Sequence, residues 1–104
     1  MQVRGRFELQ GQAWIRVLRA EGNRLVIEDS VEGADGLELS YAWRVAPGWA
    51  WDGESVLVKD SQRVHVSLSE DLEWSVDEEA TGVVFRATAW VSPSKRIFSR
   101  FELR

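Results

Sequence analysis

Residues 37–45 read Leu-Glu-Leu-Ser-Tyr-Ala-Trp-Arg-Val, with an apolar side chain at every second position. A period of two is typical of a β-strand that buries one face and exposes the other. Leu39, Tyr41 and Trp43 share the apolar face, and the residues between them are polar or small. This stretch therefore predicts a half-buried strand.

The same alternation recurs along most of the chain, and turn residues separate the alternating segments. Glu21-Gly22-Asn23 and Asp52-Gly53 are typical hairpin turns, and further reversals are expected at residues 33–36, at Pro47-Gly48 and at Ser92-Pro93-Ser94. Strands are expected around residues 12–20, 24–32, 37–45, 63–68, 85–91 and 97–103, with shorter strands beside the Asp52-Gly53 turn. About eight strands cannot bury their apolar faces in one flat sheet, so we predict an all-β, two-sheet antiparallel sandwich. A closed β-barrel is the alternative.

The segment from Leu68 to Val76 fits two secondary structures. Leu68, Leu72 and Val76 lie at helical spacing, yet Leu72, Trp74 and Val76 also alternate. We predict a strand because the neighbouring segments are strands. The acidic residues between positions 70 and 79 lack the ligand spacing and glycine of a calcium loop, so we expect a solvated loop there.

Length and composition limit the possible functions. A chain of 104 residues has the size of one domain, so we predict a single β-sandwich domain over residues 1–104. The absence of cysteine excludes disulfides, thiolate metal sites and a cysteine nucleophile. A net charge of −4 gives no attraction to nucleic acid or to anionic membranes, and neither is expected as a partner. Residues 1–11 contain no apolar signal-peptide region, which indicates a cytoplasmic protein or a fragment of a longer one.

Few side chains are suited to catalysis. His65 is the single histidine and lies on the outward face of its predicted strand, whereas Tyr41 is in phase with core residues. The sequence contains no Gly-rich phosphate loop, nucleophile elbow or His-Glu-x-x-His motif. We therefore predict no enzyme activity for the isolated chain, no catalytic residue, no metal and no cofactor.

Tryptophan is unusually frequent, with six in 104 residues. Trp43 and Trp74 are in phase with core residues, Trp90 is out of phase with its apolar neighbours, and the pattern does not place Trp14. Trp49 and Trp51 flank one alanine, so in an extended chain their rings share a face about 6–7 Å apart. Such a pair either stacks on sugar rings or plugs the end of the sandwich.

Three stretches carry a family resemblance. Residues 25–33 read Leu-Val-Ile-Glu-Asp-Ser-Val-Glu-Gly, and residues 37–48 end in Trp-Arg-Val-Ala-Pro-Gly. They resemble the C-terminal β-sandwich region of the heparinase II/III-like polysaccharide lyases, where a strand of the type "lvi.D.veG" leads to one ending in "h.aPg". Residues 90–94, Trp-Val-Ser-Pro-Ser, are similar to the segment before the last strand of that family.

The resemblance implies a carbohydrate context without catalysis. Members of this family join an α-helical toroid to β-sheet domains, and their catalytic groups come mainly from the toroid and the adjoining sheet. This chain has no helical region, and it lacks the family's histidines near residues 36–39 and near Trp43. We therefore predict an accessory or C-terminal β-sandwich of a polysaccharide-lyase-like protein, whose partners are an anionic polysaccharide and an upstream helical catalytic domain.

Four side chains are the predicted carbohydrate contacts: Trp49 and Trp51 for stacking, with Arg44 and Arg63 as carboxylate partners. The alternative function is a structural or protein-interaction β-sandwich with no carbohydrate affinity. A third hypothesis, a minimal lyase using Tyr41 and His65, is disfavoured because β-elimination also needs a group that neutralises the uronate carboxylate.

Overall fold

The computed structural model describes residues 1–70, 72–93 and 95–104, and these residues form ten β-strands and no helix. The strands are β1 (Gln2–Leu9), β2 (Gln12–Glu21), β3 (Arg24–Glu32), β4 (Leu37–Arg44), β5 (Ala50–Trp51), β6 (Val56–Lys59), β7 (Gln62–Leu68), β8 (Ser75–Glu79), β9 (Gly82–Val91) and β10 (Arg96–Leu103). The all-β prediction is confirmed.

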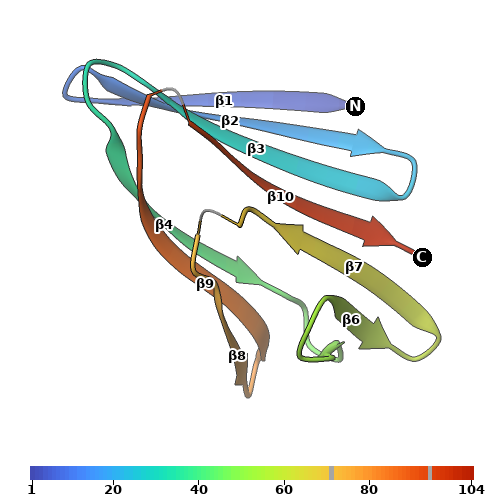
Figure 1. The fold of residues 1–104 in the computed structure, drawn as a ribbon. Helices are drawn as coiled ribbons and strands as arrows, with labels where there is room; N and C mark the ends of the chain where they lie inside the picture. The colour runs from blue at the N-terminus through green and yellow to red at the C-terminus, as the bar shows by residue number, and fades with distance from the viewer. Residues whose placement is uncertain (71, 94) are drawn as a thin grey trace.

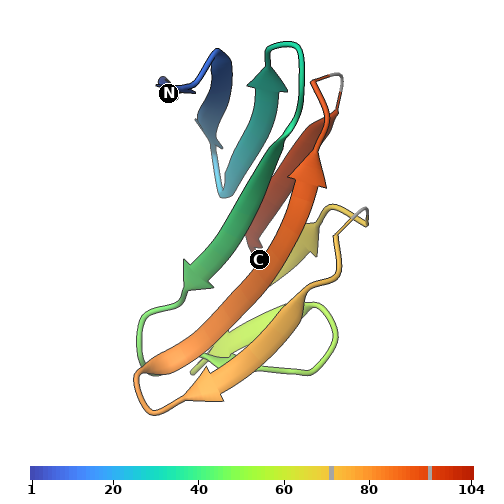
Figure 2. The ribbon, with the colours of Figure 1, turned by 90° about the vertical axis from the view of Figure 1, so that its left-hand side faces the viewer.

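The strands form two antiparallel sheets. The large sheet has seven strands in the order β1-β2-β3-β10-β7-β6-β5, and the small sheet has three in the order β4-β9-β8 (Figure 1). Figure 2 shows β4 and β9 in front of β10, with the β1–β2 hairpin to one side. The described strands therefore form a two-sheet sandwich and do not close into a barrel, because the large sheet ends at β1 and β5.

The predicted turns join the strands as expected. Gly22 and Asn23 connect β2 to β3. In the connection from β5 to β6, one carboxylate oxygen of Asp52 accepts hydrogen bonds from the backbone N–H groups of Glu54, Ser55 and Val56, at 2.8, 2.9 and 3.0 Å. These bonds lower the pKa of Asp52, because they stabilise its ionised form. The predicted reversal at residues 92–94 lies between β9 and β10, and Ser94 is outside the described residues.

The core between the sheets consists of two apolar clusters. The first contains Val31, Leu39, Tyr41, Leu72, Ala87, Val91 and Ile97, and the second contains Leu57, Val66, Val83 and Phe85. The predicted faces of β4 and β9 are confirmed, since Leu39, Tyr41 and Ala87 are buried while Trp90 is exposed. Trp43 and Trp74 pack against both clusters, as their phase predicts.

The strand prediction for residues 68–76 is only partly right. β7 ends at Leu68 and β8 begins at Ser75, so most of the segment is a connection between the two sheets. Ser69 fastens it to β10, because the backbone N–H of Ser69 donates to the carbonyl of Phe98 at 3.1 Å and its hydroxyl accepts from the N–H of Phe98 at 2.8 Å. Within the acidic run, residues 75–79 form β8 and not a loop, and Asp71 lies outside the described residues.

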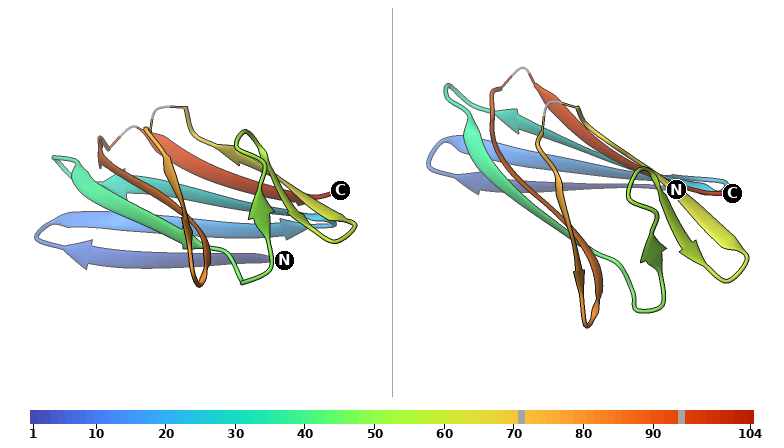
Figure 3. Two further views of the ribbon diagram at one scale, coloured as in Figure 1. Left: turned by 90° about the horizontal axis from the view of Figure 1, so that it is seen from below. Right: turned by 60° about the horizontal axis from the view of Figure 1, so that its bottom comes forward.

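β1 is a strand that the alternation of apolar residues does not predict. Val3, Phe7 and Leu9 alternate with polar residues, but Gly5 interrupts the apolar series. All eight residues of β1 are exposed, and β2 is its single neighbour in the sheet. Figure 3 shows β1 at the outer edge of the large sheet.

Candidate functional site

Trp49 and Trp51 pack against the core. Both are partly buried against the second apolar cluster. Trp51 lies opposite the core residue Leu57, and its ring meets the ring of Phe85 edge-on, with the centroids 5.0 Å apart at 89°. This arrangement favours the role of a plug for Trp51 over that of a flat stacking surface.

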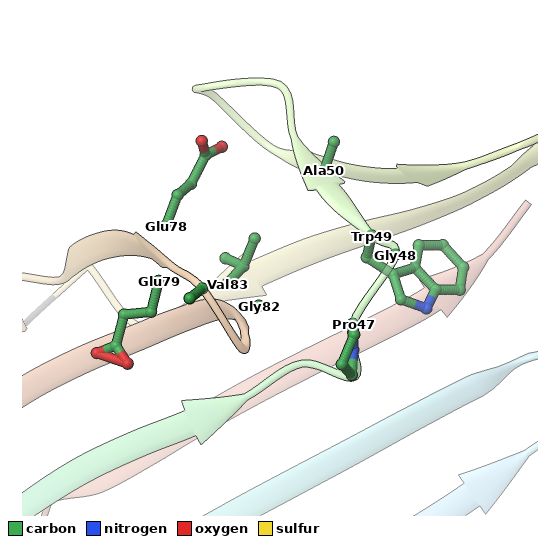
Figure 4. Close-up of a pocket in the computed structure, with 9 residues that line it drawn as sticks. Pro47, Gly48, Trp49, Ala50, Glu78, Glu79, Gly82 and Val83 are labelled. Atoms are coloured by element: carbon green, nitrogen blue, oxygen red, sulfur yellow. The ribbon is translucent and has the colours of Figure 1, made fainter.

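A pocket of about 240 Å³ adjoins Trp49 and includes Pro47 and Val83 in its lining. Glu78 and Glu79 lie across the pocket from Trp49 (Figure 4). A hydrogen bond from Arg86 lowers the pKa of Glu79, so this carboxylate stays ionised. Two carboxylates at its rim make the pocket unsuitable for an anionic polysaccharide.

The two predicted arginines lie on different surfaces. Arg44 projects from β4 of the small sheet, and its side chain is 61% exposed and 3.5 Å from the carboxylate of Glu79. Arg63 lies opposite Val58 on the outer face of the large sheet, whereas Trp51 faces inward from the same sheet. The four predicted contact residues therefore do not form one surface.

Tyr41 and His65 are also separated. Tyr41 is buried between the sheets, and His65 is partly buried on the outer face of β7, opposite Glu102. Burial, followed by the negative charge of Asp29, raises the pKa of Tyr41. Within the described part of the chain, the Tyr41 hydroxyl has no hydrogen-bond partner. The residues of the minimal-lyase hypothesis do not share a site.

A buried ion pair lies between β2 and β3. Asp29 is 1% exposed and accepts hydrogen bonds from Arg16 Nε at 2.8 Å, Arg16 Nη2 at 3.1 Å and Trp14 Nε1 at 3.1 Å. The Arg16 guanidinium lies 4.8 Å from the ring centroid of Trp14 and 4.7 Å from that of Trp43. Trp14, which the sequence pattern does not place, thus faces inward. Every charge-bearing atom of Asp29 is neutralised within the protein, which indicates a structural role.

The outer face of the large sheet is basic. Residues directly opposite each other on neighbouring strands share a face, so the register identifies the outward positions. These strand positions hold seven arginines and five glutamates: Arg4, Arg6, Arg19, Arg24, Arg63, Arg96 and Arg100, with Glu8, Glu21, Glu28, Glu32 and Glu102. The face thus has a formal charge of +2 on a chain whose net charge is −4. Negative charge is concentrated elsewhere on the molecule.

Phe98 lies near the centre of this outer face and is 41% exposed. Arg96 and Arg100 flank it at the two nearest same-face positions of β10, and the Arg100 guanidinium is 5.8 Å from the ring centroid. Glu28, opposite Phe98, accepts hydrogen bonds from Arg19 at 3.2 Å and Arg96 at 2.9 Å. The arrangement combines an aromatic ring with several guanidinium groups on the outer face of one sheet.

Three of the seven arginines, Arg4, Arg63 and Arg100, form no ion pair with any described residue. Their guanidinium groups are available to an external anion. Of these three, only Arg63 is among the carbohydrate contacts predicted from the sequence. The other residues of this surface have no local sequence signal, because cross-strand register brings them together.

The described residues contain no group of three or more His, Asp or Glu residues that would hold a metal ion. They also contain no helix long and apolar enough to cross a membrane. Comparisons with protein-family models and with curated proteins found no match for this chain. The resemblance to the heparinase II/III-like lyases therefore stays a prediction.

Proposed function

We propose that this domain is a non-catalytic accessory β-sandwich that binds an anionic polysaccharide on the outer face of its large sheet. The observation that carries the proposal is the exposed ring of Phe98 between Arg96 and Arg100, on the basic face of an otherwise acidic chain. Arginine binds carboxylate and sulfate groups in a bidentate manner, and an aromatic ring packs on the apolar face of a sugar. Acidic groups and apolar sugar faces both recur along an anionic polysaccharide.

The charge density favours a polysaccharide over nucleic acid. Glutamates alternate with arginines on the outer face, and Glu28 and Glu32 already accept hydrogen bonds from Arg19 and Arg6. A nucleic-acid interface needs several closely spaced phosphate contacts, which these glutamates would oppose. A uronate polymer needs fewer guanidinium groups at wider spacing. We further propose, from the family resemblance, that the domain holds the polymer for a helical lyase domain of the same protein.

The test compares arginines on the two outer surfaces. Arg100→Glu should weaken binding to alginate, which carries one carboxylate per sugar, by about tenfold or more, because one charge-assisted hydrogen bond is worth roughly 1.5–3 kcal/mol. Arg44→Glu is the matched control, since it makes the same charge change on the small sheet. Isothermal titration should find its affinity within about twofold of the wild-type value.

Trp51→Ala completes the set and tests the predicted tryptophan site. We expect it to lower stability while leaving the affinity of the folded protein unchanged, because Trp51 packs against Phe85. Equal weakening by Arg100→Glu and Arg44→Glu would show that net charge alone controls binding. Absence of binding to every acidic polymer, or equal binding to duplex DNA, would reject the proposal and leave the protein-interaction function.

A further inference from the structure

β1 presents a long open edge. It pairs with β2 without interruption from Gln2 opposite Arg19 to Leu9 opposite Gln12. The other edge of the same sheet is β5, which has only two residues. Proteins usually protect long edges with charged side chains, proline or a β-bulge. β1 has no proline, no lysine and no bulge, and its charged residues Arg4, Arg6 and Glu8 carry both signs, so they can pair with a complementary strand. An edge of this kind is suited to pairing with another strand.

The backbone groups that face outward follow from the β1–β2 hydrogen bonds. Met1 and Ala20 exchange both of their backbone bonds, N–H of Ala20 to the carbonyl of Met1 at 2.9 Å and the Met1 amino group to the carbonyl of Ala20 at 3.2 Å. Hydrogen-bonded and non-hydrogen-bonded pairs alternate in an antiparallel ladder, so the odd-numbered residues of β1, like Met1, bond to β2. The even-numbered residues turn their N–H and C=O groups to the free edge. These residues are Gln2, Arg4, Arg6 and Glu8.

The inward side chains of β1 lack a cover. Val3, Phe7 and Leu9 are 54%, 60% and 52% exposed. They share a face with Leu18 and Trp14 of β2. The strands of the small sheet do not pass over β1 (Figure 2). A second strand beside β1 would bring further apolar side chains onto this face.

We propose that β1 pairs antiparallel with β1 of a second copy, in the register centred on Arg6, and joins the two large sheets into one. In this register Arg4 lies opposite Glu8 of the second copy, and the two-fold axis repeats the pair. The two Arg6 residues meet at the axis. Each is already neutralised within its own chain, since Arg6 donates to Glu8 at 2.9 Å and to Glu32 at 2.7 Å.

The apolar side chains also match in this register. Val3 lies opposite Leu9 of the second copy, and Phe7 lies opposite Gly5. Space is available for the ring beside Gly5, because a Cβ atom placed there would meet no atom of its own chain within 4 Å. Cross-strand pairs of apolar and aromatic side chains are the stabilising units of a sheet.

The two nearest alternative registers are less favourable. Centring on Gly5 would place Arg4 opposite Arg6 of the second copy twice, and like charges directly opposite are destabilising. Centring on Phe7 would pair only residues 5–9 of each β1. The sequence of β1 is therefore complementary to itself in one register, and this self-complementarity identifies the occupant as a second copy.

The joined sheet would place two basic outer faces side by side, because the two-fold axis is perpendicular to the sheet. Two copies of the surface around Phe98 would then contact one polymer chain together, which raises the apparent affinity. The dimer itself does not depend on the proposed polysaccharide binding, and its test contains no polysaccharide.

Sedimentation equilibrium across a range of concentrations tests the dimer. Wild-type protein should approach twice the monomer mass of 11.9 kDa. Arg6→Pro should stay monomeric, and its unfolding midpoint should match that of wild-type protein measured at concentrations low enough to be monomeric, because the N–H that it removes faces the free edge and not β2. A wild-type mass of 11.9 kDa at all concentrations, or a dimer of Arg6→Pro, would overturn the proposal.

A mixing experiment tests the register. Arg4→Glu and Glu8→Lys should each weaken self-association by about tenfold or more, because each opposes like charges twice in its own dimer. A mixture of the two variants should form dimers again, since every opposing pair then carries opposite charges. Dimers in either variant alone, or none in the mixture, would exclude the register centred on Arg6.

Discussion

The inner face of the large sheet is closed in different ways at its two ends. At the β7-β6-β5 end, apolar side chains meet the small sheet directly, and Phe85 is fully buried. At the β1–β2 end, the Arg16–Asp29 ion pair fills the space beside the first cluster, and Phe7 beyond it remains exposed. Both ends contain alternating apolar residues. Coverage by the second sheet therefore decides which of these residues become core.

The largest expected difference in the free energy of unfolding is between a phenylalanine-to-alanine substitution at the β5 end and the same substitution at the β1 end. Phe85→Ala should lower the free energy of unfolding by about 3–5 kcal/mol, because it leaves a cavity in a packed core. Phe7→Ala should change it by at most about 0.5 kcal/mol in dilute, monomeric protein. Urea unfolding of the two variants measures the difference. Similar losses would show that the β1 end is packed as tightly as the other.

The Arg16–Asp29 ion pair should contribute less to the free energy of unfolding than Phe85 does, but more than an ion pair on the surface. Asp29→Asn leaves Arg16 without its partner, which costs about 3–5 kcal/mol for a fully buried pair. Because the Arg16 side chain is 27% exposed, we expect a loss of about 2 kcal/mol.

Glu28→Gln is the control for the ion pair, since it removes two ion pairs on the outer face of the same strand. It should cost at most about 1 kcal/mol. Thermal unfolding monitored by tryptophan fluorescence compares the two variants. A larger loss for Glu28→Gln would contradict the structural role of the buried pair.

The smallest effect at neutral pH is expected for Tyr41→Phe, because the buried hydroxyl makes no hydrogen bond to a described residue. Alkaline pH should distinguish this variant from wild type. The raised pKa keeps the Tyr41 hydroxyl protonated in the folded state, whereas the same hydroxyl in the unfolded chain loses its proton at about pH 10. Deprotonation therefore favours the unfolded state, and wild-type stability should fall as pH rises through that value.

Tyr41 is the single tyrosine, so the phenylalanine variant removes this contribution completely. Unfolding free energies measured between about pH 8 and about pH 11 should diverge, with the variant losing less stability. Parallel curves for the two proteins would show that Tyr41 has an ordinary pKa in the folded state.

Much of the fold follows from local patterns. The alternation in residues 37–45 identifies the buried face of β4, and the turn residues mark the ends of most hairpins. The pattern is weaker where a strand has no covered face. Gly5 interrupts the apolar series of β1, whereas Leu72 and Trp74 alternate with polar residues although neither lies in a strand.

The surface around Phe98 could not be predicted from local sequence patterns. Trp49 and Trp51 attract attention because they are close in sequence, yet Trp51 packs against Phe85 from a distant strand. The surface around Phe98 combines residues from β2, β3 and β10, whose positions in the sequence carry no shared motif. Only strand order and register place these side chains together.

The period of two and the turn residues are local properties, and they are sufficient to predict antiparallel strands with one mainly apolar face. They leave the sandwich and the closed barrel as alternatives, and strand order decides between them. The extent of each sheet is a property of the tertiary structure. A three-stranded sheet cannot cover seven strands, so Phe85 becomes core while Phe7 stays exposed. The physical reason is that an apolar side chain is buried only where another surface packs over it, and strand pairing between residues distant in the sequence determines where the two sheets pack.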